Sequence, residues 1–255
     1  MARILVTGSA QGIGAQTARD LAALGHDVVV HGRTPERADA ALAAVPGASA
    51  VVVGDFDSLA SVRELASAAR RAGPFDVVIH NAALGPDQPE PVTTVDGLER
   101  MLQINVVAPY VLTCLMPLAP RMVYIGSDAH RYGTVTFDSA ASGWDGGQAY
   151  ADSKLLLQMW VFELAASATH AAVNIVHPGW VRSAMGGPGA ALPLEDGADT
   201  PVWMATSDDD LALGSGAFVH ERAAEDVNPA SLDQDARAAV VARLEELTGL
   251  VLPTS

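Results

Sequence analysis

The sequence I-L-V-T-G-S-A-Q-G-I-G, residues 4–14, joins a β-branched run to a glycine-rich turn and to an alanine-rich helical segment that ends at Gly25. Gly8 permits a tight turn after a strand, Gly12 lets the backbone approach a pyrophosphate, and Gly14 lets the helix pack closely on the sheet. The helix N-terminus then faces the anion. The spacing differs from the common G-x-G-x-x-G, and a purely structural turn is the alternative, so the flanking strand and helix carry the prediction of a dinucleotide site. Its expected contacts are Gly8, Ser9, Gln11, Gly12, Ile13 and Gly14.

The same alternation of β-branched runs and helical segments continues along the chain. The runs are continuously apolar, which is typical of strands buried on both faces of a parallel sheet, and each connecting segment is long enough for a crossover helix. The sequence therefore predicts an α/β Rossmann fold, a doubly wound, seven-stranded parallel sheet with helices on both faces. The predicted strands cover residues 4–7, 27–31, 50–53, 76–80, 122–126, 172–177 and 216–220.

Length and composition favour one domain. The chain has 255 residues, of which 49% are hydrophobic, enough for one sizeable core. No polar linker or internal repeat interrupts the alternation. We therefore predict a single domain over residues 1–255, with a cofactor-binding half over about 1–125 and a catalytic and substrate-binding half over about 126–255.

The charge balance argues against several classes of partner. The formal net charge is −15, which disfavours binding to nucleic acid or to an anionic lipid surface. No apolar run reaches the roughly 18 residues that a membrane helix needs, and the strand pattern begins at once, leaving no room for a signal peptide. The single cysteine, Cys114, lies in an apolar run and indicates a core residue. We expect a cytoplasmic protein.

The end of the second predicted strand bears on the choice of cofactor. An acidic residue there would accept hydrogen bonds from the ribose 2′-hydroxyl of NAD. This chain has V-V-V-H-G-R instead, in which Gly32 offers no carboxylate and Arg33 offers a guanidinium suited to a 2′-phosphate. The pattern predicts NADP(H) in preference to NAD(H), with Arg33 as a ligand; a solvated loop arginine is the alternative.

With its later motifs, the chain resembles the short-chain dehydrogenase/reductase family over nearly its whole length. The family's glycine motif is similar to the turn above, and its pair that meets the adenine is similar to Asp55 and Phe56. Its N-N-A-G motif resembles H-N-A-A at 80–83, which departs from it at the first and last positions. The resemblance implies that Asn81 and Ala82 approach the cofactor, and it is nearest to the retinol-dehydrogenase-like and carbonyl-reductase-like branch.

The same resemblance implies a catalytic tetrad. Q-I-N-V-V-A-P-Y resembles the helix that bears the family's catalytic asparagine, here Asn105. Y-I-G-S-D-A-H resembles the strand end that bears its catalytic serine, here Ser127. Y-A-D-S-K matches Y-x-x-x-K, which makes Tyr150 and Lys154 the remaining members and also cofactor contacts. H-P-G-W-V-R-S resembles the segment that meets the nicotinamide, and it contributes Pro178, Gly179, Val181 and Ser183.

The chemistry of Tyr150 and Lys154 supports this interpretation. Hydride transfer at carbon needs proton transfer at oxygen, and an ordinary tyrosine pKa of about 10 is too high for base work at neutral pH. On a predicted helix over 148–168 the two side chains share one face, so we expect Lys154 to lower the pKa of Tyr150. Ser127 would stabilise charge on the substrate oxygen. The resemblance gives Asn105 a role in relaying protons.

The segment between Ser127 and Tyr150 is longer than is common in the family. We expect it to cover the substrate mouth, where Tyr132, Phe137 and Trp144 either line an apolar pocket or anchor the loop to the body. The expected substrate is a small carbonyl or alcohol of apolar or aromatic character. No metal site is expected, because the histidines lack ligand spacing.

Two functional hypotheses follow. The intact tetrad favours an NADP(H)-dependent carbonyl reductase or alcohol dehydrogenase, whereas a non-catalytic NADP(H)-binding sensor or interaction protein on the same fold would not need the tetrad. The apolar V-F-E-L face of the catalytic helix favours a homodimer or homotetramer. A monomer is the alternative, because of the long segment before Tyr150.

Overall fold

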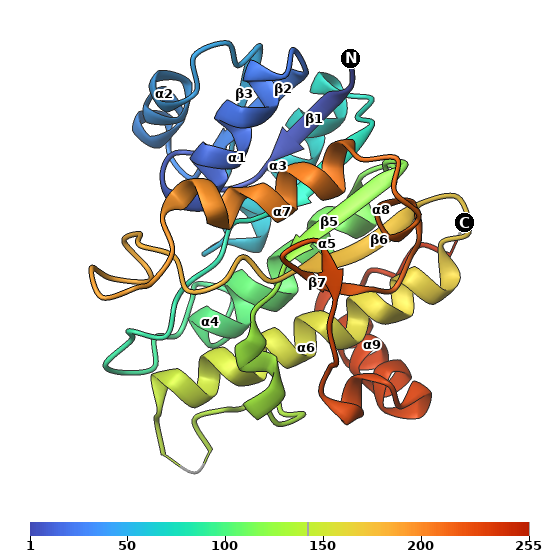
Figure 1. Cartoon of the computed structure of the whole chain (residues 1–255). Helices are drawn as coiled ribbons and strands as arrows, with labels where there is room; N and C mark the ends of the chain where they lie inside the picture. The colour runs from blue at the N-terminus through green and yellow to red at the C-terminus, as the bar shows by residue number, and fades with distance from the viewer. Residues whose placement is uncertain (142, 255) are drawn as a thin grey trace.

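The computed structural model describes residues 1–141 and 143–254, and one sheet runs through it (Figure 1). The strand order is β3-β2-β1-β4-β5-β6-β7-β8. The first seven strands pair in parallel at the predicted places, which confirms the predicted α/β Rossmann fold. The strands are β1 (Arg3–Val6), β2 (Asp27–Gly32), β3 (Ala50–Val53), β4 (Val77–His80), β5 (Arg121–Ile125), β6 (Ala172–Val176), β7 (Phe218–His220) and β8 (Ala223–Ala224).

The described sheet has one strand more than predicted. β8 pairs antiparallel with β7, so the sheet is mostly and not wholly parallel. The two strands are joined by Glu221 and Arg222, whose φ angles are 46° and 61°. A two-residue hairpin turn of this kind is normally signalled by Asn or Gly, and these residues give no such signal.

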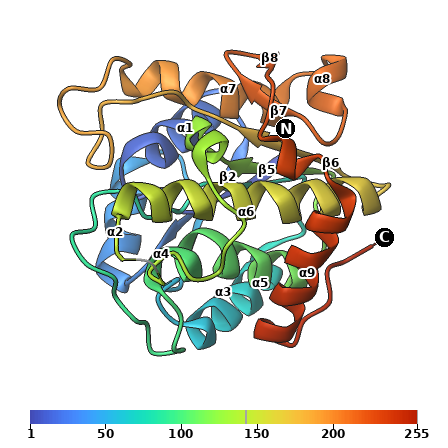
Figure 2. The same ribbon diagram turned by 90° about the horizontal axis from the view of Figure 1, so that it is seen from below.

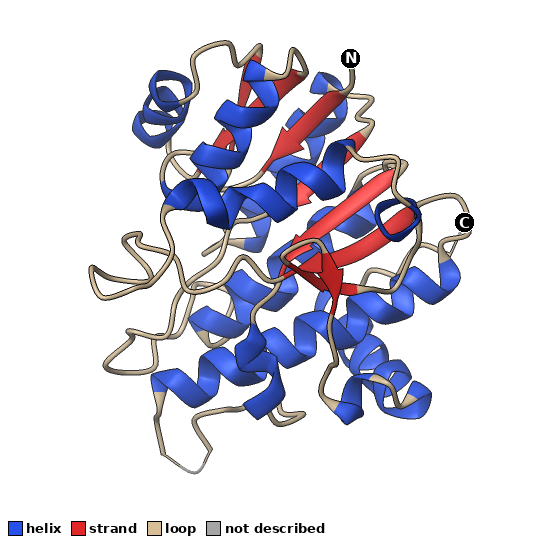
Figure 3. Ribbon diagram, in the orientation of Figure 1, coloured by secondary structure: helices blue, strands red, loops and turns tan. Residues whose placement is uncertain are grey.

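Helices cover both faces of the sheet. Figure 2 shows α1 and α7 on one face and α3, α5, α6 and α9 on the other. Figure 3 distinguishes the helices, in blue, from the central strands, in red. The principal helices are α1 (Gly12–Ala23), α2 (Pro35–Ala44), α3 (Leu59–Ala72), α5 (Ala108–Leu115), α6 (Gly146–Ser167), α7 (Leu194–Thr206) and α9 (Gln234–Thr248). Short elements are α4 (Arg100–Leu102), the π-helix η1 (Gln103–Val107), the 3-10 helices η2 (Asp128–Tyr132) and η3 (Pro229–Ser231), and α8 (Asp210–Leu213).

The continuous apolar runs are explained by two cores. Along β1, Leu5 belongs to the cluster on one face of the sheet, whereas Ile4 and Val6 belong to the cluster on the other. Each strand therefore buries successive side chains in opposite directions. Among the described residues, no helix combines the length and apolar character that a membrane crossing needs.

Helix α6 begins at Gly146, two residues before the predicted start. The Asp145 carboxylate accepts hydrogen bonds from the amides of Gly147 at 2.8 Å and Gln148 at 3.0 Å, an N-cap that determines this boundary. The outer face of α6 is covered by α9, and Arg237 of α9 pairs with Glu163 of α6 at 3.1 Å. Helix α9 therefore packs on the V-F-E-L segment, residues 161–164, from which a homodimer or homotetramer was predicted.

Candidate active site

The glycine turn after β1 requires glycine because β4 approaches it closely. A Cβ on Gly8 would lie 2.8 Å from the Cα of Ala82, and one on Gly14 would lie 2.2 Å from the Nδ2 of Asn81. Gly8 and Gly12 also have φ of 67° and 61°, in the left-handed region that favours glycine. The turn therefore brings α1 close to the carboxyl ends of β1 and β4.

The N-terminus of α1 has the character of an anion site. Its N-cap residue, Gln11, makes no side-chain hydrogen bond to the helix amides, and the first turn of this 12-residue helix carries no acidic residue. The first amides thus keep free donors at the positive end of the helix dipole. Ser9 and Ile13 belong to the same turn. Because its glycines have no side chains, a pyrophosphate can approach the backbone of the turn. The residues present fit a dinucleotide.

Asn81 braces the sheet. Its Nδ2 donates to the carbonyl of Thr7 at 2.8 Å, while its own amide and that of Ala82 donate to the Thr7 hydroxyl at 2.9 and 3.0 Å. Ala83, where the family pattern has glycine, is not among the residues with positive φ. The backbone after β4 is therefore compatible with alanine.

His31 is a residue that motif spacing missed. It is 2% exposed, its Nδ1 accepts the Gly8 amide at 2.9 Å, and its Nε2 donates to the carbonyl of Gly54 at 2.8 Å. Its ring also lies 5.5 Å from that of Phe56. Burial lowers the pKa of His31, which favours the neutral ring that this bonding pattern needs. His31 thus joins the glycine turn to the end of β3.

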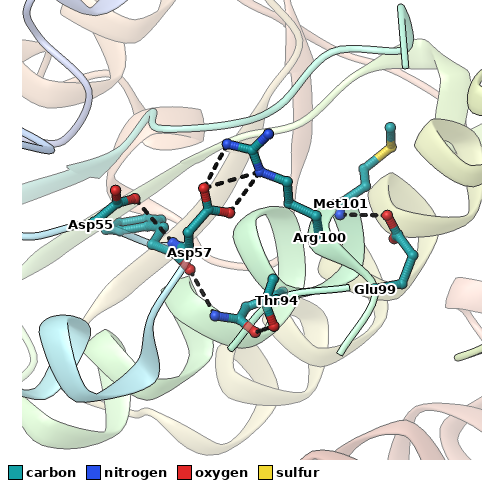
Figure 4. A network of polar contacts seen from close by, with 8 residues as sticks. Asp55, Asp57, Thr94, Glu99, Arg100 and Met101 are labelled. Carbon is teal, nitrogen blue, oxygen red and sulfur yellow. Dashed lines mark hydrogen bonds and ion pairs between the residues drawn. The ribbon is translucent and has the colours of Figure 1, made fainter. Parts of the chain in front are cut away.

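The predicted adenine-binding pair lies at the end of β3. Asp55 is half-buried and accepts the amide of Asp57 at 3.1 Å, whereas the Phe56 side chain is buried in the core. Figure 4 shows the polar network that joins this turn to α4 and η1. In it Arg100 pairs with Asp57 through Nε at 2.7 Å, and Gln103 Nε2 donates to the carbonyl of Phe56 at 3.1 Å.

Two arginines stand at the end of β2. Arg33 is exposed. This exposure is compatible both with a ligand for a 2′-phosphate and with a solvated loop arginine. Arg37, four residues on in α2, donates from Nη2 to the side chain of Gln11 at 2.6 Å. A Cβ on Gly32 would lie 2.3 Å from the amide nitrogen of Ala38, so this position has no room for a carboxylate. Arg37 was not predicted, because its approach to the glycine turn depends on the fold.

Ser127, Tyr150 and Lys154 are brought together beyond the carboxyl end of β5. Ser127 is buried and caps η2, accepting the amide of Ala129 at 3.2 Å. Lys154 is 2% exposed, its Nζ donates to the carbonyl of Ile125 at 2.9 Å, and it lies 5.6 Å from the centroid of the Tyr150 ring. The serine and the tyrosine, 23 residues apart in sequence, thus meet at one end of the sheet.

The expected effect of Lys154 on Tyr150 is not found. Burial raises the pKa of Tyr150 to about 12, the Ser127 side chain opposes this rise, and the charge of Asp128 adds to it. Burial also lowers the pKa of Lys154 to about 8. The prediction was wrong because helical spacing shows which side chains share a face, whereas the desolvation that dominates here depends on tertiary packing.

Asn105 lies in the π-helix η1, a distortion that often marks functional sites. Its side chain accepts the amide of Leu84 at 2.7 Å and donates to the carbonyl of Leu84 and the hydroxyl of Ser153, both at 3.0 Å. Ser153 in turn donates to the carbonyl of Tyr150 at 2.8 Å. Asn105 thus reaches the catalytic helix next to Lys154, and a proton relay through it stays a prediction.

The segment after β6 faces the glycine turn. A Cβ on Gly12 would lie 3.9 Å from the Cβ of Ser183, and Gly179 has φ of 80° with Leu192 packed against it. Val181 is buried and forms a β-bridge with Leu192. Within residues 178–183 the side chains of Pro178 and Val181 are buried, whereas that of Trp180 is 62% exposed.

The long segment before Tyr150 is held along α6. The buried Asp152 carboxylate accepts the amide of Thr134 and the hydroxyl of Ser139, both at 2.8 Å. Phe137 packs against the core, so it anchors the segment. Ser142, which belongs to the same segment, lies outside the described residues.

The two other aromatic residues of the segment differ from each other. The Trp144 indole donates to the carbonyl of Gln88 at 2.8 Å, linking the segment to the loop after β4. Tyr132 is 77% exposed. Whether this segment covers the substrate mouth stays a prediction. In the described ranges, no three His, Cys, Asp or Glu side chains are grouped so as to hold a metal ion.

Comparison with known proteins agrees with this geometry. Residues 2–190 match the family model for short chain dehydrogenase. The chain is 35% identical over 261 residues to the short-chain dehydrogenase chyC of Penicillium rubens, covering 99% of this chain and 100% of the relative. It is 29% identical to human retinol dehydrogenase 14, covering 97% of this chain and 86% of the relative.

Solved structures agree as well. An uncharacterised protein from Mycobacterium Paratuberculosis superposes with a TM-score of 0.85 at 26% identity, over 99% of this chain and 95% of that one. A blue fluorescent protein from a metagenomic library, solved in complex with NADPH, gives 0.69 at 27% identity over 86% of this chain and 95% of that one. The chain belongs to the short-chain dehydrogenase/reductase family of oxidoreductases.

Proposed function

We propose that the protein is an NADP(H)-dependent oxidoreductase that interconverts a carbonyl and an alcohol, with Tyr150 as general acid and base. The observation that carries the proposal is the convergence of Ser127, Tyr150 and Lys154 beyond β5, at the same carboxyl edge of the sheet as the uncapped N-terminus of α1. A sensor would need the anion site and would gain nothing from burying a lysine beside a tyrosine. Desolvating an ammonium is costly, which favours a functional reason for it.

The proposed reduction uses the chain's own groups at the substrate oxygen. With a pKa of about 12, Tyr150 holds its proton at neutral pH and donates it to that oxygen as the carbonyl becomes an alcohol. Ser127 donates a hydrogen bond to the same oxygen and stabilises the charge that develops on it. Lys154, with a pKa of about 8, stays mainly cationic at neutral pH, and its Nζ lies 5.6 Å from the centroid of the Tyr150 ring. A bound reduced nicotinamide would supply the hydride.

The preference for NADP(H) is proposed from the end of β2. Arg33 and Arg37 supply two guanidinium groups there, and the crowding around Gly32 excludes the acidic side chain that would accept the 2′-hydroxyl of NAD. The NADPH complex of the metagenomic relative supports the same assignment. In this arrangement Gly8, Gly12 and Gly14 serve the pyrophosphate.

A monomer is the assembly that the fold favours. The α6 face that suggested a dimer is covered by η3 and α9 of the same chain, through a hydrogen bond of 3.2 Å from Gln158 to Ser231 of η3 and the pair between Arg237 of α9 and Glu163. An interface on that face would have to displace α9. Light scattering after size exclusion would give about the chain mass of 26.3 kDa for a monomer, and twice or four times that mass would support a dimer or tetramer.

The activity is tested by following NADPH absorbance with a panel of apolar and aromatic ketones, aldehydes and quinones. Tyr150→Phe serves as the control, because it keeps the ring and removes the proton donor. Turnover that this variant abolishes supports the proposal. Tight binding of NADPH with no turnover of any carbonyl would favour the sensor.

A further inference from the structure

Asp128 places a carboxylate beside the catalytic serine. The Ser127 hydroxyl donates to Asp128 Oδ1 at 3.3 Å, and the Asp128 side chain is 62% exposed. Asp128 is the first residue of η2, and the N-cap of that helix is already supplied by Ser127. The carboxylate is therefore available to a molecule that approaches Ser127 from solvent.

No cation neutralises this carboxylate within the described residues. The nearest basic group is Nε2 of His177 at 3.8 Å, and burial lowers the pKa of His177 to about 4, so the ring is uncharged at neutral pH. Arg131, also in η2, pairs with Glu225 at 2.7 Å. The Lys154 ammonium donates to the carbonyl of Ile125. Among the described residues Asp128 therefore has no arginine or lysine paired with it, and the one other charge at the site is the ammonium of Lys154.

The charge of Asp128 is felt where the reaction would occur. After burial, which is the larger cause, Asp128 acts on Tyr150 to raise the pKa of its hydroxyl. The carboxylate is therefore within electrostatic reach of both hydroxyls that would contact the substrate oxygen. A charged group on the substrate close to its carbonyl would experience the same field.

We propose that Asp128 is a specificity-determining residue that selects carbonyl substrates bearing a cationic group, such as an ammonium, and disfavours those bearing a carboxylate. The inference rests on the proposed reductase function and names a substrate class for it. The attraction acts across a partly solvated gap, so we expect it to change relative turnover by about tenfold. It should weaken as salt is added.

Three aryl ketones of matched shape test this: acetophenones with a para trimethylammonium, tert-butyl or carboxylate group. The first two are close isosteres that differ in charge. For the wild type we expect kcat/KM to be about tenfold higher for the cationic than for the neutral ketone and lowest for the carboxylate. Asp128→Asn should lower the ratio of the cationic to the neutral ketone by about tenfold relative to the wild type, because the electronic effect of each substituent on the ketone is the same in both proteins. Because each ratio of kcat/KM values compares two ketones in the same variant, an effect of the substitution on the acidity of Tyr150 cancels.

Asp138→Asn is the matched control. It removes the same charge from an exposed residue of the segment before α6. The backbone amide of Asp138 donates a hydrogen bond to the Thr136 hydroxyl, and this bond does not involve the carboxylate that is replaced. This variant should keep the wild-type ratios. Asp128→Ser is a second variant in case the asparagine protein folds poorly. Equal ratios in the wild type and in either folded Asp128 variant would overturn the inference.

Calorimetric titration of the same ketones into the NADPH-loaded protein separates this inference from the proposed function. In one outcome the cationic ketone binds more tightly than the neutral ketone, this difference is lost in the Asp128 variants, and no carbonyl is reduced. The reductase proposal then fails, whereas the charge selectivity of Asp128 stands. If the neutral ketone is reduced without any discrimination by charge, the reductase proposal stands and the role of Asp128 is wrong.

Discussion

Nδ1 of His31 accepts the amide of Gly8 at 2.9 Å, which joins the end of β2 to the first residue of the glycine turn. The opposite nitrogen, Nε2, donates to Gly54 at 2.8 Å, so the neutral ring has one defined tautomer. Three strand ends that form the proposed cofactor site are therefore connected through one buried imidazole. The first prediction depends on this connection.

Replacing His31 with alanine should weaken NADPH binding by roughly tenfold. The substitution leaves the half-buried Gly8 amide and the buried Gly54 carbonyl without partners, a loss of about 1–3 kcal/mol that the glycine turn can relieve only by moving. A fluorescence titration with NADPH measures the effect. His26→Ala, which removes an imidazole that accepts the Ala2 amide at 3.2 Å outside the site, is the control. Unchanged affinity in the His31 variant would contradict this positioning role.

Acidification should destabilise the protein through its buried histidines. Burial lowers the pKa of His31, lowers that of His177 to about 4 and that of His80 to about 3. Since the unfolded chain binds protons more readily, the contribution of each ring is complete above about pH 6.5 and is lost as the pH falls toward its folded pKa. Each strongly shifted ring should cost about 2 kcal/mol between pH 7.5 and 5.

Urea unfolding at a series of pH values tests this dependence. His80→Phe is an informative variant, because His80 stacks on Tyr124 with ring centroids 4.5 Å apart and phenylalanine can preserve the stacking. It should flatten the decline in the free energy of unfolding between pH 7.5 and 5. An equally steep decline in this variant would assign the acid sensitivity to other groups.

The sequence predicted those features that depend on local pattern. Seven parallel strands were found because strands buried on both faces are continuously apolar, whereas β8 was missed because Glu221 and Arg222 occupy a hairpin turn without its usual residues. The cap at Asp145 lengthens α6 by two residues at its start relative to the prediction.

The site shows the same division. Motif spacing named Ser127, Tyr150 and Lys154, which the fold brings together. It did not find His31 or Arg37, because their partners Gly8 and Gln11 lie 23 and 26 residues away in sequence and meet them only through the sheet order. It also could not weigh desolvation, which depends on long-range packing and reverses the expected shift in the pKa of Tyr150.

Replacing Arg33 with alanine should raise the KM for NADPH by about tenfold and change the KM for NADH little, because only the 2′-phosphate needs the guanidinium. Arg37→Ala should act in the same direction and also loosen Gln11, which accepts its Nη2 at 2.6 Å. Steady-state kinetics with both cofactors measure the two effects. Arg63→Ala, which removes an arginine bonded to the carbonyl of Thr248 instead, is the control. Equal changes for NADPH and NADH would remove Arg33 from the 2′-phosphate site.

Lys154→Arg should fold and lose turnover by about 100-fold. Lys154 is the one lysine in a chain with fourteen arginines, so the position is not explained by a general preference for lysine. Its ammonium is 2% exposed, donates to the carbonyl of Ile125 at 2.9 Å and lies 5.6 Å from the Tyr150 ring centroid. A planar guanidinium on a longer stem fills more of this enclosed space and directs its donors in a fixed fork.

The measurement that isolates this effect is kcat with saturating NADPH, together with circular dichroism to confirm the fold. The guanidinium stays charged at every accessible pH, so the variant keeps the cation while changing its shape and acidity. Lys154→Met removes the charge at similar length and should lose at least as much turnover. If the arginine variant turns over normally, a cation of any shape is sufficient at this position, and the compact ammonium is not the reason for the single lysine.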